Sequence, residues 1–294
     1  MRFRPALLLP ALIAAIANGA AGPAMAQIQL QGAVGGDQSA GMIEQGVALR
    51  APSESSVIGR QLRLNGASGR LAFEKRGADF VISRLVLSGE KISARSESCE
   101  VDITGGPFVL RPIRRFDGLR RFEGDIPACP FTVEILDSAV QINVGDATAS
   151  TPTAGYCEFK AADCRGSVAG FWGPAGASMS LADIAQNERI RGLAEKNAQA
   201  NYRALIASAG KDRAKVRMAA SEQAGFSSRR AERCEDYAGE ERHGFCASRI
   251  TDAWAIALRA RQNPAAFEAE EANAAKKPAP ARGPAMQLGP QTLR

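Results

Sequence analysis

Apolar and polar positions alternate in short runs between residues 42 and 144, which is the period-2 pattern of half-buried β-strands. Turn signals at Asn65-Gly66, Gly105-Gly106-Pro107 and Asp117-Gly118 separate the runs. The runs are RQLRLNG, GRLAFEK, DFVISRLVLSGE, SCEVDITGG, FVLRP and FTVEILDSAVQINV. They predict a sandwich-like or barrel-like β-rich domain over residues 42–144.

The pattern changes to helical spacing after residue 180. Ser180 and Asp183 are placed as the N-cap and the first-turn acid of a helix. Apolar residues then recur at steps of three and four through three segments, about 180–206, 211–237 and 245–262. These segments predict a three-helix domain over residues 180–262. The fold class is therefore α+β, with an N-terminal disulfide-bridged β-rich domain followed by a C-terminal three-helix domain.

The remaining segments have the composition of connecting or unstructured chain. Residues 27–41 are rich in Gly and Gln and predict a flexible lead-in. Residues 145–179 predict a linker, which begins without apolar periodicity and continues as an irregular segment stapled by a Cys157–Cys164 bridge. Asn263-Pro264 is typical of a helix stop, and residues 263–294 predict a disordered Pro/Ala-rich tail.

The first 26 residues have the pattern of a cleavable secretory signal peptide. Arg2 and Arg4 precede an apolar run, and Ala24 and Ala26 give an A-x-A cleavage pattern, so cleavage is expected near Ala26. The run is shorter than the roughly 20 residues that span a bilayer. The sequence therefore predicts a periplasmic or secreted protein with no membrane span. Without the peptide, 35 basic side chains face 31 acidic ones, a net charge of about +4, which is too mild to indicate a nucleic-acid partner.

Six cysteines follow the signal peptide, and an even number in an oxidising compartment favours disulfides. They are Cys99, Cys129, Cys157, Cys164, Cys234 and Cys246. Six cysteines allow 15 connectivities. Proximity along the chain favours Cys157–Cys164 and Cys234–Cys246, which leaves Cys99–Cys129. A zinc site is the competing interpretation, disfavoured because the chain has no C-x-x-C motif and one histidine.

Motifs for nucleophilic or nucleotide chemistry are absent from the sequence. His243 is the only histidine, no serine lies in a G-x-S-x-G motif, and no Walker loop or dinucleotide fingerprint occurs. A pair of carboxylates for glycoside cleavage remains an alternative, because such a pair is assembled in three dimensions. The pattern favours a binding or structural protein, neither an enzyme nor a cofactor carrier.

Three groups of residues between 190 and 261 form a family pattern. The first is Glu195, Tyr202 and Leu205; the second is Gln223, Phe226, Arg230 and Cys234; the third is Cys246, Thr251, Leu258 and Arg259. On these residues the segment resembles the LprI-type lysozyme inhibitor domain, a small cysteine-containing α-helical domain of bacterial envelope proteins. The chain departs from the family at Phe226, where the family usually has tryptophan, and at Trp254, where it usually has arginine.

The resemblance implies inhibition of a lysozyme-type glycoside hydrolase by protein–protein contact. The stretch between Cys234 and Cys246 carries four acids against Arg242, a net charge of about −3, and a bridge would make it a rigid acidic tip. A basic lysozyme is a suitable partner for such a tip. The candidate contact residues are Glu235, Asp236, Tyr237, Glu240, Glu241, His243 and Phe245. The alternative is that these charges are only solvated.

A second candidate surface is basic. Arginines surround two phenylalanines in RPIRRFDGLRRFEGD, namely Arg111, Arg114, Arg115, Arg120 and Arg121 around Phe116 and Phe122. They could bind an anionic glycan or lipid headgroup through the β domain of a non-inhibitory envelope protein, or form a solvated hairpin loop.

Four other residues receive structural interpretations. Arg230 is expected to pair with an acid such as Glu195. His243 is expected to be a loop residue rather than a pH switch. Trp172 and Trp254 are expected to be core anchors.

Overall fold

The computed structural model describes residues 49–103, 106, 108–113, 117–126, 129–144 and 156–276. Residues 42–294 belong to one compact unit, so the β-rich and helical parts of the sequence are not separate units. The expected signal peptide, the lead-in, residues 145–155 and residues 277–294 lie outside the described residues, as do Arg114, Arg115 and Phe116.

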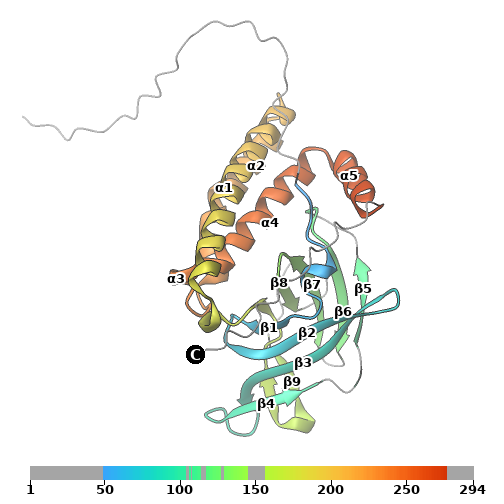
Figure 1. The fold of residues 1–294 in the computed structure, drawn as a ribbon, viewed down its shortest axis with the longest axis vertical. Coiled ribbons are helices and arrows are strands. Elements are labelled where there is room, and N and C mark those ends of the chain that lie inside the picture. The colour runs from blue at the N-terminus through green and yellow to red at the C-terminus, as the bar shows by residue number, and fades with distance from the viewer. Residues whose placement is uncertain are drawn as a thin grey trace, which may run out of the picture. The chain divides into compact units, whose positions relative to one another are not determined.

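Eight antiparallel strands form a closed barrel (Figure 1). They are β1 (Gln61–Leu64), β2 (Ser68–Arg76), β3 (Asp79–Lys91), β5 (Phe108–Ile113), β6 (Arg121–Ile126), β7 (Cys129–Leu136), β8 (Ala139–Val144) and β11 (Gly170–Gly173). Their order is β2-β1-β11-β8-β7-β6-β5-β3, and pairing of β2 with β3 closes the ring. The predicted barrel-like region is confirmed, and it also contains β6 and β11, which the alternation pattern did not predict.

Strand β3 extends beyond the barrel and carries a smaller set of strands. Its last residues pair with β4 (Ser98–Asp102) on one side and with β10 (Cys164–Gly166) on the other, and β10 pairs with β9 (Cys157–Phe159). The predicted irregular linker over residues 145–179 is therefore wrong for its second half, because β9, β10 and β11 belong to the sheet. Strands of three or four residues are too short to show a recognisable alternation.

The two disulfides of the β region differ from the predicted pairs. The structure joins Cys99 to Cys164 and Cys129 to Cys157, so the predicted Cys99–Cys129 and Cys157–Cys164 bridges are wrong. The reason is strand pairing. β4 and β10 both flank the end of β3, where Gly89 faces Cys99 on one side and the β10 strand on the other. Cysteines that are far apart in sequence are thereby brought within bonding distance.

The barrel interior is filled with side chains. Phe73 stacks on Phe80 with ring centroids 5.0 Å apart, and Phe80 contacts Phe122 at 4.9 Å. Trp172 of β11 is completely buried and its indole N–H donates to the carbonyl of Val168 at 2.8 Å. The expectation that Trp172 is a core anchor is confirmed, and the barrel is a hydrophobic core rather than a channel.

In the part of the chain that the structure describes, five α-helices follow the barrel. They are α1 (Leu181–Ala209), α2 (Arg213–Cys234), the short α3 (Glu240–His243), α4 (Phe245–Gln262) and α5 (Pro264–Lys276). Ser180 caps α1 in a capping box with Asp183, as the sequence predicted, and this hydrogen bonding lowers the pKa of Asp183. The three predicted long helices are confirmed.

Small residues allow α1 and α4 to pack closely along their lengths (Figure 1). Ala194, Ala198 and Ala204 are buried on α1, and Ala255 is fully buried on α4. Asn201 of α1 is also fully buried, and its side-chain amide donates to the carbonyl of Ala255 at 2.9 Å. Because alanine side chains are short, the two helices can approach each other more closely than leucine-lined helices would.

A second hydrophobic core joins the barrel to the helices. Leu136 and Phe171 come from the barrel, and Tyr237, Phe245 and Ile250 come from the helical part; all five are buried. The separate β domain (42–144) and helical domain (180–262) of the sequence analysis are therefore two parts of one unit. Apolar side chains of the loop and of α4 therefore pack against the barrel as well as against the other helices.

The prediction of a disordered tail is wrong for the first part of that segment, which forms helix α5. Asn263 ends α4, and its side-chain oxygen accepts from the backbone N–H of Ala266 at 3.0 Å at the start of α5. Phe267 is buried against Gly118 and Ala260. An Asn-Pro pair is typical of a helix stop, but proline is also favoured at the first position of a new helix, since its missing N–H needs no partner there.

Candidate functional site

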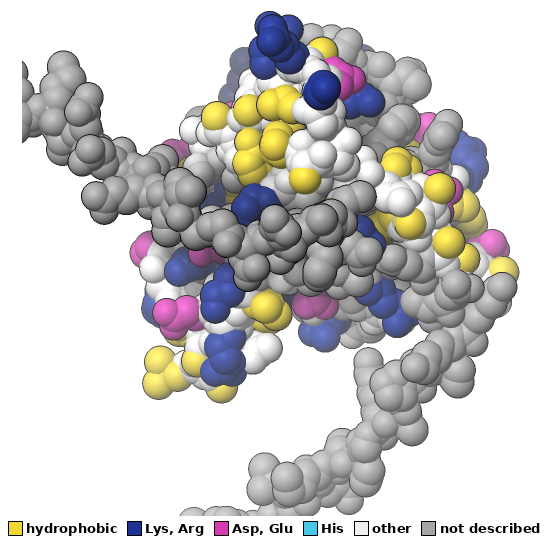
Figure 2. Space-filling view, turned by 90° about the horizontal axis from the view of Figure 1, so that it is seen from above, with side chains coloured by type: hydrophobic (Ala, Val, Ile, Leu, Met, Phe, Trp, Pro, Cys, Tyr) yellow, Lys and Arg dark blue, Asp and Glu magenta, His cyan; other side chains and the backbone are white. Residues whose placement is uncertain are grey.

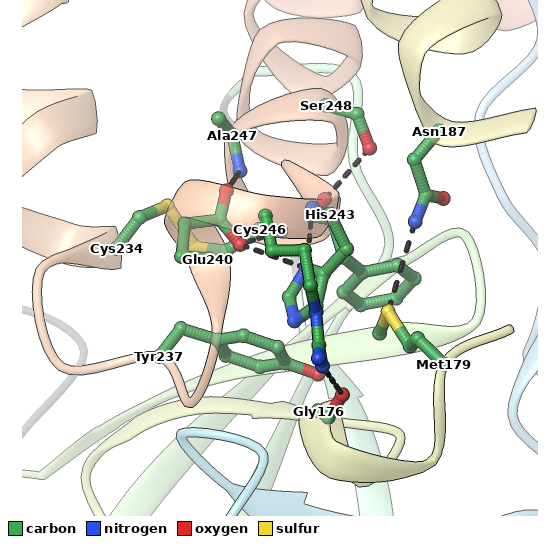
Figure 3. A network of polar contacts seen from close by, with 12 residues as sticks. Gly176, Met179, Asn187, Cys234, Tyr237, Glu240, His243, Cys246, Ala247 and Ser248 are labelled. Carbon is green, nitrogen blue, oxygen red and sulfur yellow. Dashed lines mark hydrogen bonds and ion pairs between the residues drawn. A yellow bond between two sulfur atoms is a disulfide. The ribbon is translucent and has the colours of Figure 1, made fainter. Parts of the chain in front are cut away.

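The loop from Cys234 to Cys246 is a small, tightly fixed structure (Figure 3). The predicted Cys234–Cys246 disulfide is present, with the two Cα atoms 5.6 Å apart. Gly239 and Gly244 flank the short helix α3 with φ of 77° and 57°, a region in which other residues are strained. The backbone N–H of Ala238 donates to the carbonyl of Asn65 at 2.8 Å, which anchors the loop to a barrel turn.

Glu240 is a helix cap. One of its carboxylate oxygens accepts from the N–H of Cys246 at 2.9 Å and the other from the N–H of Ala247 at 2.8 Å (Figure 3). Burial raises the pKa of Glu240, and these two hydrogen bonds act against the increase. The expectation that Glu240 contacts a partner is therefore corrected, because its carboxylate satisfies the first free N–H groups of α4.

Tyr237 and Phe245 attach the loop to the barrel. They are only 2% and 3% exposed, and both rings meet Phe171 of β11 edge-on, at 5.4 and 6.1 Å. The Tyr237 hydroxyl donates to the carbonyl of Pro174 at 2.6 Å, and burial raises the pKa of this phenol. They are not exposed anchors for a partner, because the barrel surface already covers them.

His243 is buried beneath the same loop and lies edge-on to Tyr237 (Figure 3). The N–H of Phe245 donates to Nδ1 at 3.2 Å, so Nδ1 is the acceptor and Nε2–H donates to the carbonyl of Ala238 at 2.9 Å. The side chain thus has a structural role. Its expected place among the contact residues is corrected.

Three of the seven candidate contact residues remain on the surface. Glu235, Asp236 and Glu241 are exposed, beside an exposed Arg242 that reaches the carbonyl of Gly176 at 3.4 Å. Figure 2 shows basic and acidic side chains interspersed on the face that it presents. Salt screens exposed charges beyond about 10 Å, so the loop acids would attract a cationic partner only at short range.

Most residues of the LprI-type pattern contact one another. Arg230 contacts Glu195 at 3.4 Å and donates to the Thr251 hydroxyl at 3.0 Å, which confirms the expected Arg230–Glu195 pair. Gln223 accepts from the Trp254 indole N–H at 3.0 Å. Three further members, Tyr202, Leu205 and Leu258, share the α1–α4 core. Arg259 donates to Gln262 at 3.2 Å.

Trp254 is half-buried rather than enclosed. Its ring stacks on Phe226 with centroids 5.2 Å apart and an interplanar angle of 13°. The two positions at which the sequence differs from the LprI-type pattern, Phe226 and Trp254, are therefore in contact with each other.

The arginine-rich segment of the barrel is mostly occupied by intramolecular ion pairs. Arg120 contacts Glu54 at 2.9 Å, and Arg121 contacts Glu134 at 2.7 Å. Phe122 points into the barrel core. Arg111 is exposed and lies 3.5 Å from Glu123. Arg120 and Arg121 are thus committed to the barrel and are not free to bind an anionic polymer. Phe122 is covered as well.

Two arginines that the sequence analysis did not single out border a groove between α2, α4 and the barrel. Arg229 and Arg233 are exposed and lie four residues apart, on the α2 face that carries Phe226. Their spacing relative to Phe226 places all three on one helical stripe. The stripe expected from the sequence runs through Gln223, Phe226, Arg230 and Cys234 and does not include Arg229 and Arg233.

Within the described residues, no group of three or more His, Cys, Asp or Glu side chains is placed to hold a metal ion. No helix in the same part of the chain is both long and apolar enough to cross a membrane. All six cysteines are joined in disulfides.

The architecture is thus a side-chain-filled barrel, a helical part that shares its core, and a disulfide-closed loop fixed between them. Comparison with family models, with curated proteins and with solved structures gave no match for this chain.

Proposed function

We propose that the protein is an exported binding protein that inhibits a peptidoglycan-cleaving lysozyme through the Cys234–Cys246 loop. The resemblance to LprI-type inhibitors supports the inhibitory role. The secretory signal pattern at the start of this arginine-rich, disulfide-bridged chain supports export. Three disulfides are compatible with an oxidising compartment outside the cytoplasm.

The observation that carries the proposal is the rigidity of the loop. Four features restrain the loop. They are the disulfide, the Glu240 cap, the buried Tyr237 and Phe245 rings, and a backbone hydrogen bond to the barrel. A loop ordered in advance loses little conformational entropy when it binds. The backbone that carries the exposed acids is therefore fixed before binding, whereas a flexible loop would be immobilised at a cost in entropy.

The test is hydrolysis of bacterial cell walls by a cationic chicken-type lysozyme, with the purified oxidised protein titrated in. The variant Glu235→Gln/Asp236→Asn/Glu241→Gln removes the three exposed loop charges. Each exposed charge contact contributes about 0.2–1 kcal/mol, so inhibition is expected to weaken by about tenfold. The loss should shrink at high salt, where exposed charges are screened.

A matched control removes the same charges elsewhere. Glu74 and Asp79 are exposed on the barrel and Glu158 is exposed on β9, and Glu74→Gln/Asp79→Asn/Glu158→Gln changes the net charge equally. Equal weakening by both triple variants would show that only the total charge matters. Absence of inhibition by the folded protein against several lysozyme types would refute the proposal.

A further inference from the structure

The groove between α2, α4 and the barrel has a volume of about 290 Å³. Its apolar lining comes from three places: Phe226 and Trp254 form a stacked aromatic pair, while Leu119 and Leu136 come from the barrel and Ile250 from α4. Apolar surface from helices and barrel thus meets in one concave place. The groove can accommodate a small apolar group in contact with the Trp254 ring.

The acidic side chains in the groove are already neutralised by neighbouring arginines. Arg261 contacts Asp117 at 2.9 Å and also contacts Glu222. Burial lowers the pKa of Arg261, but hydrogen bonds and charge from the two acids outweigh it, so the pKa is raised overall. Arg121 contacts Glu134 at 2.7 Å. These carboxylates therefore present little free negative charge to a ligand.

The basic side chains on the α2 wall are different. Five arginines line the groove against three acids. Arg229 donates to the backbone carbonyl of Glu222 at 2.7 Å, and Arg233 is exposed one helical turn further along α2. Across the described part of the chain, neither guanidinium has a carboxylate within ion-pair distance. One wall of the groove, next to its aromatic pair, therefore carries two positive groups that have no carboxylate partner among the described residues.

We propose that this groove binds a small amphipathic anion, a carboxylate or phosphate attached to an apolar chain. The chain lies on Trp254 and Phe226, and the anionic head is bound between Arg229 and Arg233. Guanidinium groups match the geometry of carboxylate and phosphate oxygens and form charge-assisted hydrogen bonds with them. This site is separate from the loop acids of the proposed inhibitor function and would bind a ligand of opposite charge.

Tryptophan fluorescence gives a direct readout. The chain has two tryptophans; Trp172 is enclosed in the barrel core, whereas Trp254 lines the groove. Titration with octanoate and with octyl phosphate should each give a saturable change, and their relative affinities identify the preferred head group. Octyl glucoside has the chain without the charge, and inorganic phosphate has the charge without the chain. Both should bind at least tenfold more weakly.

Matched charge variants test the role of the two arginines. Arg229→Gln/Arg233→Gln should weaken octanoate or octyl phosphate binding by about tenfold. Arg213→Gln/Arg217→Gln removes the same charge from exposed positions of the same helix outside the groove and should leave binding unchanged. All four side chains are exposed, so both variants should fold, which far-UV circular dichroism verifies.

Equilibrium dialysis with radiolabelled octanoate and octyl phosphate measures binding independently of fluorescence. The proposal is overturned if neither anion binds saturably by dialysis, if octyl glucoside binds as tightly as the anions, or if the two charge variants weaken binding equally. Saturable binding that depends on Arg229 and Arg233 alone would support it. Loss of the fluorescence change in Trp254→Phe would place the ligand at the aromatic pair.

Discussion

Replacing Tyr237 with alanine should lower the free energy of unfolding, because this side chain connects the Cys234–Cys246 loop to the barrel. The side chain is 98% buried, and an aromatic side chain of this size buries about 150–250 Å². At about 25 cal/mol per Å², its complete removal costs about 4–6 kcal/mol, and loss of the hydroxyl hydrogen bond to Pro174 adds about 1 kcal/mol. Since alanine retains some of the burial, we expect a loss of about 3–5 kcal/mol.

Urea unfolding followed by far-UV circular dichroism measures this loss. A fall of about 10 °C in melting temperature should accompany it, since 1 kcal/mol corresponds to about 2–4 °C in a chain of this size. Tyr237→Phe removes only the hydroxyl and should cost about 1–2 kcal/mol.

Tyr156→Ala is the control, because Tyr156 is 57% exposed and should lose less than about 1 kcal/mol. If Tyr237→Ala lost no more stability than Tyr156→Ala, the ring would not be a core residue. The sequence-based interpretation of Tyr237 as a surface anchor would then be restored.

Three further predictions concern other parts of the molecule. Replacing Cys234 and Cys246 together with alanine should lower the free energy of unfolding by about 3 kcal/mol, because the sequence separation of 12 closes a short ring; non-reducing urea titration measures this, and a change below about 1 kcal/mol would contradict it. Burial raises the pKa of Asp252, with the neighbouring Arg249 acting against it, so the stability that this group contributes is present at acid pH and is lost as the pH rises through the raised pKa. Asp252→Asn should therefore gain stability relative to the wild type between pH 3.5 and pH 7 in parallel unfolding curves, and a constant difference would contradict the shift. Phe267→Ala should lower the local stability of α5 by about 3 kcal/mol, seen as faster amide exchange in residues 264–276, whereas unchanged exchange would show that the helix is not held by this ring.

The sequence predicted the elements whose pattern is long and local. Strands β2, β3 and β7 are eight or more residues long, and the long helices show clear three- and four-residue spacing. Strand β6 does alternate, with Phe122 inward and Arg121 and Glu123 outward, but its window is short and charged. The Arg-rich composition therefore favoured a loop.

The contact residues of the loop could not be judged from the sequence alone. Tyr237 and Phe245 are buried by Phe171, which is more than sixty residues earlier in the chain, and their aromatic character is equally typical of a binding surface. The two disulfide pairs predicted for the β region were wrong for a similar reason, because strand pairing decides which cysteines meet. Arg230 and Glu195 were predictable because a charged side chain on an apolar helical stripe requires a partner.

Strand β11 has a consequence for how the chain is assembled. It pairs with β1 on one side and β8 on the other, so the ring closes only after residue 173 is available. A fragment that stops at residue 144 would leave β1 and β8 as two bare sheet edges, and such edges invite aggregation. During synthesis the barrel can therefore close only after the thirty residues that follow residue 144 have been made, and a truncated protein would be a target for proteases or chaperones rather than a smaller domain.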